Sequence, residues 1–344
     1  MSTDFDRKRC KPKASQTFSA GGRSYRIAGR VGNGAVGLVR KARDVESGAI
    51  RAVKFLAPDL KYIDPEAMED VAARFRREGE RGAGLHHSNL VRVICYEENS
   101  GGAAFLAKEI PTQNPPINPF VVMEYVDGRT LESRIRKAHP SHRGQFLATE
   151  DNLRIGVQIA RALQYLHKRH VIHRDVKPAN IYLGAATDSA PLQAKLGDFG
   201  VVKWGDFQAS VSTGALTVTS QRGLGTLKYM SPEQAVQPKR VTVRSDVYSL
   251  GITLFELFTS QILPSPHHVF QVMMARLKHG ATTHSRFADL RVHIDPADAD
   301  LGEMVLNMHL RGAASRPAIE RVRALLEWEL RDRFDAQVPA EEAW

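Results

Sequence analysis

The N-terminal third of the chain carries short apolar runs in which hydrophobic and polar residues alternate at the period of β-strands. Glycines and polar turns separate the first runs, as they do between the strands of an antiparallel sheet. The pattern predicts strands over residues 25–27, 36–41, 49–55, 90–96 and 120–125.

Elsewhere the apolar positions recur at helical spacing. A helix is predicted over 65–84, where Pro65 suits the first turn and acidic residues follow it. Further helices are expected over 130–137 and 152–168, and helices dominate 243–330. The predicted fold class is therefore α+β: a small, antiparallel, β-rich N-terminal lobe with one main helix, and a larger helical C-terminal lobe.

Two segments, 97–119 and 138–149, are long and polar for simple connections. Loops of such length are either functional or disordered, and the sequence leaves both open. Gly79, Gly82 and Gly84 fall near the end of the predicted helix 65–84, and each interior Gly costs about 1 kcal/mol relative to Ala. We therefore expect the end of this helix to be poorly formed until something packs on it, which makes it a candidate regulatory element.

The length of 344 residues suits one two-lobed domain with short tails. We expect a disordered arm over 1–23 and a folded domain over 24–330. Its N-lobe covers about 24–123 and its C-lobe about 127–330, and residues 331–344 form a tail.

The net charge of +10 is partly local, since five of the positive residues lie within the first thirteen. This favours a solvated basic tail over a nucleic-acid or membrane surface, although docking to an anionic partner stays open. Two cysteines make no disulfide framework, and no apolar run approaches the roughly 20 residues that span a bilayer. No specific nucleic-acid partner, no membrane span and a cytoplasmic location are expected.

A glycine-rich segment, G-x-G-x-x-G-x-V, begins at Gly32 and continues through Gly34 and Gly37 to Val39. Glycines let backbone amides approach phosphate oxygens, and the valine would cover a nucleotide base. A Rossmann turn has a similar string but opens a helix. Here strand-forming residues follow, so a strand–loop–strand hairpin fits better.

A lysine lies between apolar neighbours in the next strand, within Ala52-Val53-Lys54. Burying its ammonium requires a partner. Glu78 on the predicted helix is the preferred one, with Glu80 as the alternative, and such a pair would aim the ammonium at nucleotide phosphates.

The most informative segment runs from His173 to Asn180 and is followed by Asp198-Phe199-Gly200. It supplies Asp175 to accept a proton from an attacking hydroxyl and Lys177 to neutralise a moving phosphoryl group. Amide and carboxylate oxygens from Asn180 and Asp198 are the hard ligands that Mg²⁺ prefers.

With these segments in order, the chain resembles a Hanks-type (eukaryotic-like) serine/threonine protein kinase of bacterial character. The likeness extends from Gly32 to Arg316, about five-sixths of the chain. The remaining matches are Gly225-Thr226, Ser231-Pro232-Glu233-Gln234-Ala235, Ser245-Asp246-Val247-Tyr248-Ser249-Leu250-Gly251 and Ser315-Arg316-Pro317.

The resemblance implies a two-lobed kinase fold with ATP and Mg²⁺ as cofactors, Mn²⁺ being a candidate substitute. It implies that Asp175 is the catalytic base and that Asn180 and Asp198 are metal ligands. Lys177, two residues after the Asp, is the serine/threonine rather than the tyrosine pattern. Protein substrates, modified on Ser or Thr, are implied with it.

The resemblance also assigns the adenine pocket. Met123 would lie at its back, and Glu124 to Val126 would form the hinge whose backbone binds the base. Tyr182 stands where an aliphatic residue is usual, so an altered pocket shape is expected. Leu227 departs from the small residue or Pro usual after Gly-Thr.

Three further residues receive structural roles from the resemblance. Glu233 and Arg316 would pair to brace the large lobe, and Asp246 would anchor the catalytic loop from a buried helix.

The stretch from Asp198 to Glu233 reads as a long activation segment rich in Ser and Thr. We expect autophosphorylation there, at Thr219 first and Thr217 or Ser220 next. Arg174 and Lys203 would form the phosphate pocket, because a phosphate bridges neighbouring cations through charge-assisted hydrogen bonds. A flexible loop without any switch is the alternative.

Two rivals remain for the function. A pseudokinase scaffold usually lacks the Lys, the catalytic Asp or the metal Asp, all of which this chain has. A small-molecule kinase keeps a similar Asp pair but lacks the Gly-Thr and Ser-Pro-Glu segments that serve peptide docking.

Overall fold

The computed structural model describes two compact units. Among the described residues, the first unit takes those up to 87 together with 91–125, and the second takes 88–90 and those from 126 onwards. The described residues are 17–33, 37–56, 65–98, 119–138, 141, 143, 145–184, 192–198, 228–236, 240–261, 294–309 and 312–336.

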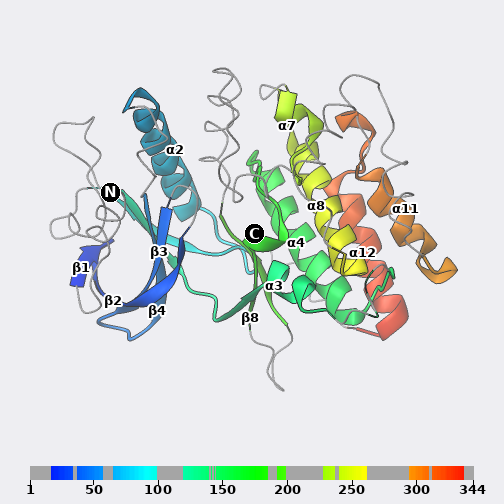
Figure 1. Cartoon of the computed structure of the whole chain (residues 1–344), viewed down its shortest axis with the longest axis horizontal. Coiled ribbons are helices and arrows are strands. Elements are labelled where there is room, and N and C mark those ends of the chain that lie inside the picture. The colour runs from blue at the N-terminus through cyan, green and yellow to red at the C-terminus, as the bar shows by residue number, and fades with distance from the viewer. Residues whose placement is uncertain are drawn as a thin grey trace, which may run out of the picture. The chain divides into compact units, whose positions relative to one another are not determined.

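The first unit is a six-stranded sheet with one long helix, α2 (Pro65–Ala83), packed against strand β5 (Figure 1). The strand order is β1-β2-β3-β4-β6-β5, and every paired neighbour is antiparallel. The predicted antiparallel, β-rich lobe with one main helix is confirmed. The strands are β1 (Thr17–Ala20), β2 (Arg23–Asn33), β3 (Gly37–Asp44), β4 (Ile50–Leu56), β5 (Val93–Glu97) and β6 (Phe120–Glu124).

Aromatic side chains fill the core on one face of this sheet. Phe18 stacks on Tyr25 with ring centroids 5.6 Å apart and meets Phe120 edge to face at 5.4 Å. All three rings are buried. The expectation of a disordered arm over 1–23 is therefore wrong for residues 17–23: pairing with β2 satisfies the β1 backbone, and burial of Phe18 offsets the entropy of ordering it. Residues 1–16 lie outside the described part.

The C-terminal end of α2 is regular through Ala83 and β5 packs against the helix, so the condition for a well-formed end is met. A regulatory role for this end stays a prediction. Its glycines serve close packing. A Cβ at Gly79 would lie 2.5 Å from Cδ2 of Tyr96, and one at Gly82 would lie 2.8 Å from Cγ2 of Val93. The helix backbone thus approaches β5 more closely than any side chain would allow.

The second unit is mainly helical, with a small antiparallel sheet in the order β7-β8-β9. Its larger, helix-dominated architecture confirms the other half of the predicted α+β fold. Its elements are β7 (Gly128–Thr130), α3 (Leu131–Arg136), α4 (Glu150–Lys168), η3 (Pro178–Asn180), β8 (Ile181–Gly184), β9 (Ala194–Leu196), α7 (Pro232–Val236), α8 (Val243–Thr259), η5 (Pro296–Asp298), α11 (Ala299–Asn307), η6 (Ala313–Ser315) and α12 (Ile319–Phe334).

Helix α8 is the centre of this unit: it is buried from Ser245 to Thr259 and contacts both α4 and α11 (Figure 1). A capping box starts it, in which the Thr242 hydroxyl accepts from the helix backbone and the Ser245 hydroxyl bonds back to the Thr242 amide. Among the described helices, α8 included, none is long and apolar enough to cross a membrane.

Helix α12 packs along α4, where Arg161 Nε donates to Glu327 Oε1 at 2.9 Å. The helix continues to Phe334, and Ala336 beyond it is buried. The predicted domain boundary at 330 is therefore wrong, because the last helical turn packs as part of the unit.

The second polar segment, 138–149, has a structural role in its described part. Phe146 lies 5.0 Å from the Phe258 ring, and the Leu147 amide donates to the Phe258 carbonyl at 2.8 Å. The segment covers the end of α8. For the other long segment, residues 99–118 lie outside the described part.

Candidate active site

Within the first unit, the glycine-rich segment joins β2 to β3. Gly32 pairs with Val39 across the two strands, and β3 continues to Asp44 rather than opening a helix. The hairpin interpretation is confirmed and the Rossmann alternative is wrong. Gly34 lies outside the described residues.

The predicted lysine–glutamate contact is present in the same unit. Lys54 Nζ lies 3.4 Å from Glu78 Oε1, with side chains 15% and 10% exposed. The ammonium also lies 6.0 Å from the Phe75 ring centroid, whereas Glu80 is exposed. Val39 is the direct cross-strand neighbour of Lys54, so both project from the same face of the sheet.

The pairing of β4 with β6 brings together residues that are assigned to the adenine pocket. Ala52 is the cross-strand neighbour of Met123, which packs against the cluster containing Phe75. The Glu124 amide donates to the Arg92 carbonyl at 2.8 Å, and its carboxylate accepts from the Arg92 amide at 3.2 Å. These two bonds fix the chain as it leaves β6 towards Val126.

The second unit brings together Asp175, Lys177 and Asn180. Asn180 Nδ2 donates to Asp175 Oδ2 at 2.7 Å and to the Asp175 carbonyl at 2.8 Å. Lys177 Nζ lies 2.9 Å from Asp175 Oδ1. All three side chains are buried. The two contacts orient the Asp175 carboxylate through both of its oxygens.

Asn180 comes just before β8 and Asp198 comes shortly after β9. Because β8 and β9 are antiparallel, both residues lie at the same end of this strand pair. Ile181 pairs with Leu196, and the Gly197 amide donates to the Asn180 carbonyl at 2.9 Å. The short sheet therefore fixes both chain segments at one end. Asp198 has φ +58°, a left-handed conformation that sets the direction of its carboxylate.

These two residues fit a magnesium ion by donor chemistry. They offer an amide and a carboxylate oxygen, and Asn180 turns its Nδ2 towards Asp175, so its oxygen is the atom suited to a cation. Among the described residues, no group of three or more His, Cys, Asp or Glu could hold a metal. A two-residue site suits Mg²⁺, which usually keeps waters and shares substrate phosphates.

Asp246 of α8 holds the loop that precedes Asp175. Its Oδ2 accepts from the His173 amide at 2.9 Å, its Oδ1 accepts from the Arg174 amide at 2.8 Å, and His167 Nε2 lies 2.9 Å from Oδ2. Arg174 has φ +67° and its carbonyl accepts from Gln234 Nε2 at 3.1 Å. Bonds on both sides of this residue hold a conformation that costs energy for a residue with a Cβ.

His173 supports the same loop from inside the protein. Its Nδ1 accepts from the Asp175 amide at 3.3 Å, and the residue is fully buried. Burial lowers the pKa of the imidazole below its ordinary value, against the raising effect of Asp246, Asp175 and Asp198 and of a hydrogen bond with Gly197. The neutral ring is thus the form that fits.

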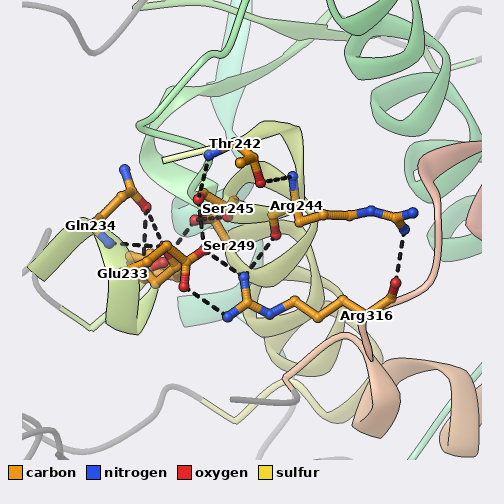
Figure 2. A network of polar contacts seen from close by, with 9 residues as sticks. Glu233, Gln234, Thr242, Arg244, Ser245, Ser249 and Arg316 are labelled. Atoms are coloured by element: carbon orange, nitrogen blue, oxygen red, sulfur yellow. Dashed lines mark hydrogen bonds and ion pairs between the residues drawn. The ribbon is translucent and has the colours of Figure 1, made fainter. Parts of the chain in front are cut away.

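The predicted Glu233–Arg316 pair is present and bidentate (Figure 2). Arg316 Nη1 lies 2.6 Å from Oε1 and Nη2 lies 2.9 Å from Oε2. The Ser245 hydroxyl donates to the same carboxylate at 2.6 Å, and the Arg244 carbonyl accepts from Arg316 Nη1 at 3.0 Å. Burial alone would raise the pKa of Glu233, but the hydrogen bonds and charge of Arg316 and the hydrogen bond from Ser245 lower it below its ordinary value.

The sequence interpretation missed a second buried ion pair in this unit. Lys228 Nζ lies 2.6 Å from Glu256 Oε1, and the Tyr229 hydroxyl donates to Glu256 Oε2 at 2.6 Å. The Ser249 hydroxyl donates to the Tyr229 carbonyl at 2.8 Å. Glu256 interrupting an otherwise apolar run was the available signal, but nothing in the sequence indicated its partner. Gln234 stands in a motif that carries the resemblance, but its contact with the Arg174 carbonyl was not predicted.

Tyr182 is half-buried between buried Ile181 and Leu183 on β8, so it projects from the opposite face of that strand. The structure places Arg174 as described above. The other residues assigned to switching and to docking lie outside the described part: Lys203, Thr217, Thr219, Ser220 and Leu227.

A β-rich unit with a Lys–Glu pair and a helical unit with the Asp175 cluster together define a protein kinase. The family model for the protein kinase domain matches residues 25–344, so the chain belongs to the protein kinase family. The resemblance and the two-lobed kinase fold are confirmed.

Bacterial serine/threonine kinases are among its relatives. The chain is 36% identical over 240 residues to a probable serine/threonine-protein kinase of Streptomyces coelicolor, which covers 70% of this chain and 30% of that protein. It is 35% identical over 237 residues to the serine/threonine-protein kinase PknB of Mycolicibacterium smegmatis, covering 69% and 32%. The chain therefore spans about a third of the length of these relatives.

Solved structures agree on the fold. A double mutant of the PknI kinase domain from Mycobacterium tuberculosis aligns with a TM-score of 0.61 at 22% identity. The alignment covers 93% of this chain and 99% of that one.

Proposed function

We propose that the chain is an active serine/threonine protein kinase that transfers the γ-phosphoryl group of ATP to Ser or Thr of protein substrates. The observation that carries the proposal is the buried Asp175, oriented by Asn180 on one oxygen and by Lys177 on the other. A pseudokinase scaffold would have no need to hold a carboxylate in this way.

Asp175 accepts the proton of the substrate hydroxyl as the oxygen attacks phosphorus. Lys177 places its ammonium beside this carboxylate, where it neutralises charge on the phosphoryl group in transit. Its hydrogen-bonding neighbours keep Asp175 in place throughout, so the reaction requires little rearrangement of these side chains.

Lys54 binds the α- and β-phosphates, and Glu78 keeps its ammonium aimed at them. Backbone amides of the loop between Gly32 and Gly37 approach the phosphates, and Val39 and Ala52 contact the base. The backbone of Glu124 to Val126 hydrogen-bonds the base, with Met123 behind it. Tyr182 is assigned to contact the base as well.

Asn180 and Asp198 would hold Mg²⁺, or Mn²⁺ in its place. The bound cation would supply positive charge to the phosphate oxygens. These two residues set its position through the backbone contact between Asn180 and Gly197.

The proposal includes autophosphorylation of the segment containing Thr217, Thr219 and Ser220, with Arg174 and Lys203 receiving the phosphate. It places the protein in the cytoplasm, and it keeps the basic N-terminal residues as a docking segment for an anionic partner.

The test uses the full chain with labelled ATP, Mg²⁺ and a generic protein acceptor. Asp175→Asn should abolish incorporation, since loss of a positioned base lowers rates by about 10²–10⁴-fold. Asp151→Asn, which alters an exposed ion pair with Arg134, is the matched control and should retain full activity. Full labelling by Asp175→Asn would rule out the assigned base, and labelling of small alcohols alone would favour a small-molecule kinase.

A further inference from the structure

Two glycines let helix α2 lie close against strand β5. Gly79 and Gly82 are three residues apart and therefore share one face of the helix. A Cβ at position 79 would lie 2.5 Å from Tyr96 Cδ2, and one at position 82 would lie 2.8 Å from Val93 Cγ2. Only glycine permits this separation of helix and strand.

A polar clamp joins the same helix face to the end of β5. Arg76 lies one turn before Gly79, and its Nε and Nη2 donate to Glu98 Oε1 and Oε2 at 2.8 and 2.7 Å. The Tyr96 hydroxyl donates to Glu98 Oε1. Burial, followed by the bond to Glu98, raises the pKa of Tyr96, so the phenol keeps its proton and remains the donor.

Tyr96 is the residue that joins these contacts. It packs on Gly79 and bonds Glu98, and its ring centroid lies 6.2 Å from that of Phe75. Phe75 is fully buried and lies under the Lys54 ammonium. Glu78 sits between Phe75 and Gly79 on the helix, so a shift of α2 relative to β5 would move Glu78 away from Lys54.

We propose that Gly79, Gly82 and Tyr96, together with the Arg76–Glu98 clamp, are positioning residues that set the Lys54–Glu78 contact by fixing α2 against β5. This inference rests on the proposed function, in which that contact aims Lys54 at the nucleotide. The glycines that weaken the helix as an isolated segment are the residues that place its glutamate.

The first experiment separates the clash from any general effect of alanine. Gly82→Ala should raise the KM for ATP and lower kcat, reducing kcat/KM for ATP by about tenfold, as overpacking of a tight contact would. Val93→Ala removes the Cγ atoms and leaves Cβ at 3.4 Å, an ordinary contact, so the double variant should recover most of kcat/KM. Gly84→Ala is the matched control, since its Cβ would meet only the Arg81 carbonyl at 3.7 Å, and its kinetics should equal wild type.

A second measurement separates positioning from general destabilisation. In a Glu78→Gln background the contact is already lost, so adding Gly82→Ala should change kcat/KM for ATP little further. A purely structural role would give the same fractional loss in both backgrounds, and that result would overturn the inference. Thermal unfolding of every variant identifies those that fail to fold.

If Gly82→Ala does not fold, the clamp provides the test. Tyr96→Phe and Glu98→Gln should each reduce kcat/KM for ATP by about two- to fivefold, the range expected for the loss of one hydrogen bond. Wild-type kinetics in both would refute the clamp. Lys54→Met separates failure of this inference from failure of the proposed function. If Lys54→Met is inactive while Gly82→Ala has the same kinetics as Gly84→Ala, the proposed function survives and this inference fails. If Lys54→Met is fully active, the proposed function itself fails.

Discussion

At the residue scale, Glu256 shows what a carboxylate requires inside the protein. Its side chain is 1% exposed and is held by Lys228 and Tyr229. Burial, followed by the charge of Glu256 and their hydrogen bond, raises the pKa of Tyr229 well above its usual value, so the phenol remains a donor. Two chain segments, residues 228–229 and helix α8, are thereby joined by one buried contact.

Removing the cation from this contact should therefore be costly. Lys228→Met should lower the free energy of unfolding by about 3–5 kcal/mol, because it leaves a buried carboxylate without its counter-charge. The double variant Lys228→Met with Glu256→Gln should recover most of that loss, since neither charge remains. Urea unfolding at pH 7 measures both, with Arg136→Met in the exposed Glu132–Arg136 pair as a control that should change little. Additive losses in the double variant would contradict the coupling.

His173 predicts a pH dependence of stability. Its folded pKa is lowered by burial from an ordinary value near 6.5, so the unfolded chain binds the proton more readily. The stabilising contribution of the neutral ring is complete above pH 6.5 and is lost as pH falls towards the folded pKa. Unfolding free energies at pH 7.5 and 5.5 should differ less in His173→Phe than in wild type. An unchanged difference would mean that other groups dominate the acid response.

At the scale of secondary-structure elements, two helix N-caps predict opposite changes in the free energy of unfolding. Thr242 caps α8 through its hydroxyl, whereas Ala318 precedes α12 with extended backbone and no side-chain cap. Thr242→Ala should lower the free energy of unfolding by about 1 kcal/mol, and Ala318→Ser should raise it by up to about 1 kcal/mol. Thermal unfolding checks both signs. A destabilising Ala318→Ser would show that the α12 backbone cannot use the hydroxyl.

The sequence was informative for elements whose signal is local. Most strands and the helices over 65–84 and 152–168 follow from periodicity, and Lys54 had a foreseeable need for a partner. Strand β1 was missed because four residues are too few to show a period. The strand forms only by pairing with Arg23–Arg26. Propensity foresaw that the glycines of α2 weaken an isolated helix, but only the packed structure reveals Tyr96 and Val93 against them.

At the scale of the whole molecule, the site residues come from segments far apart in the sequence. The Asp175 loop depends on Asp246 and Gln234, which lie 72 and 60 residues from Arg174, to which both bond. Such contacts depend on the tertiary fold, so periodicity could not indicate them. Resemblance could, because Asp246 and the Glu233–Arg316 pair belong to ordered motifs. Gln234 belongs to one of those motifs, but the motif did not indicate its contact with the Arg174 carbonyl.

Phosphorylation near Arg174 should switch the enzyme by charge. Arg174 is fixed through its backbone by Asp246 and Gln234, so its side chain starts from a rigid position beside Asp175. A phosphate of about −1.5 to −2 charge in the segment containing Thr217, Thr219 and Ser220 would pair with Arg174 and Lys203 through charge-assisted hydrogen bonds. Mass spectrometry of the active enzyme should find phosphate there, whereas the Lys54→Met variant should carry none. Changing all three residues to Ala should lower kcat towards that of phosphatase-treated wild type. An unmodified segment in active protein, with full activity in the triple variant, would exclude the switch.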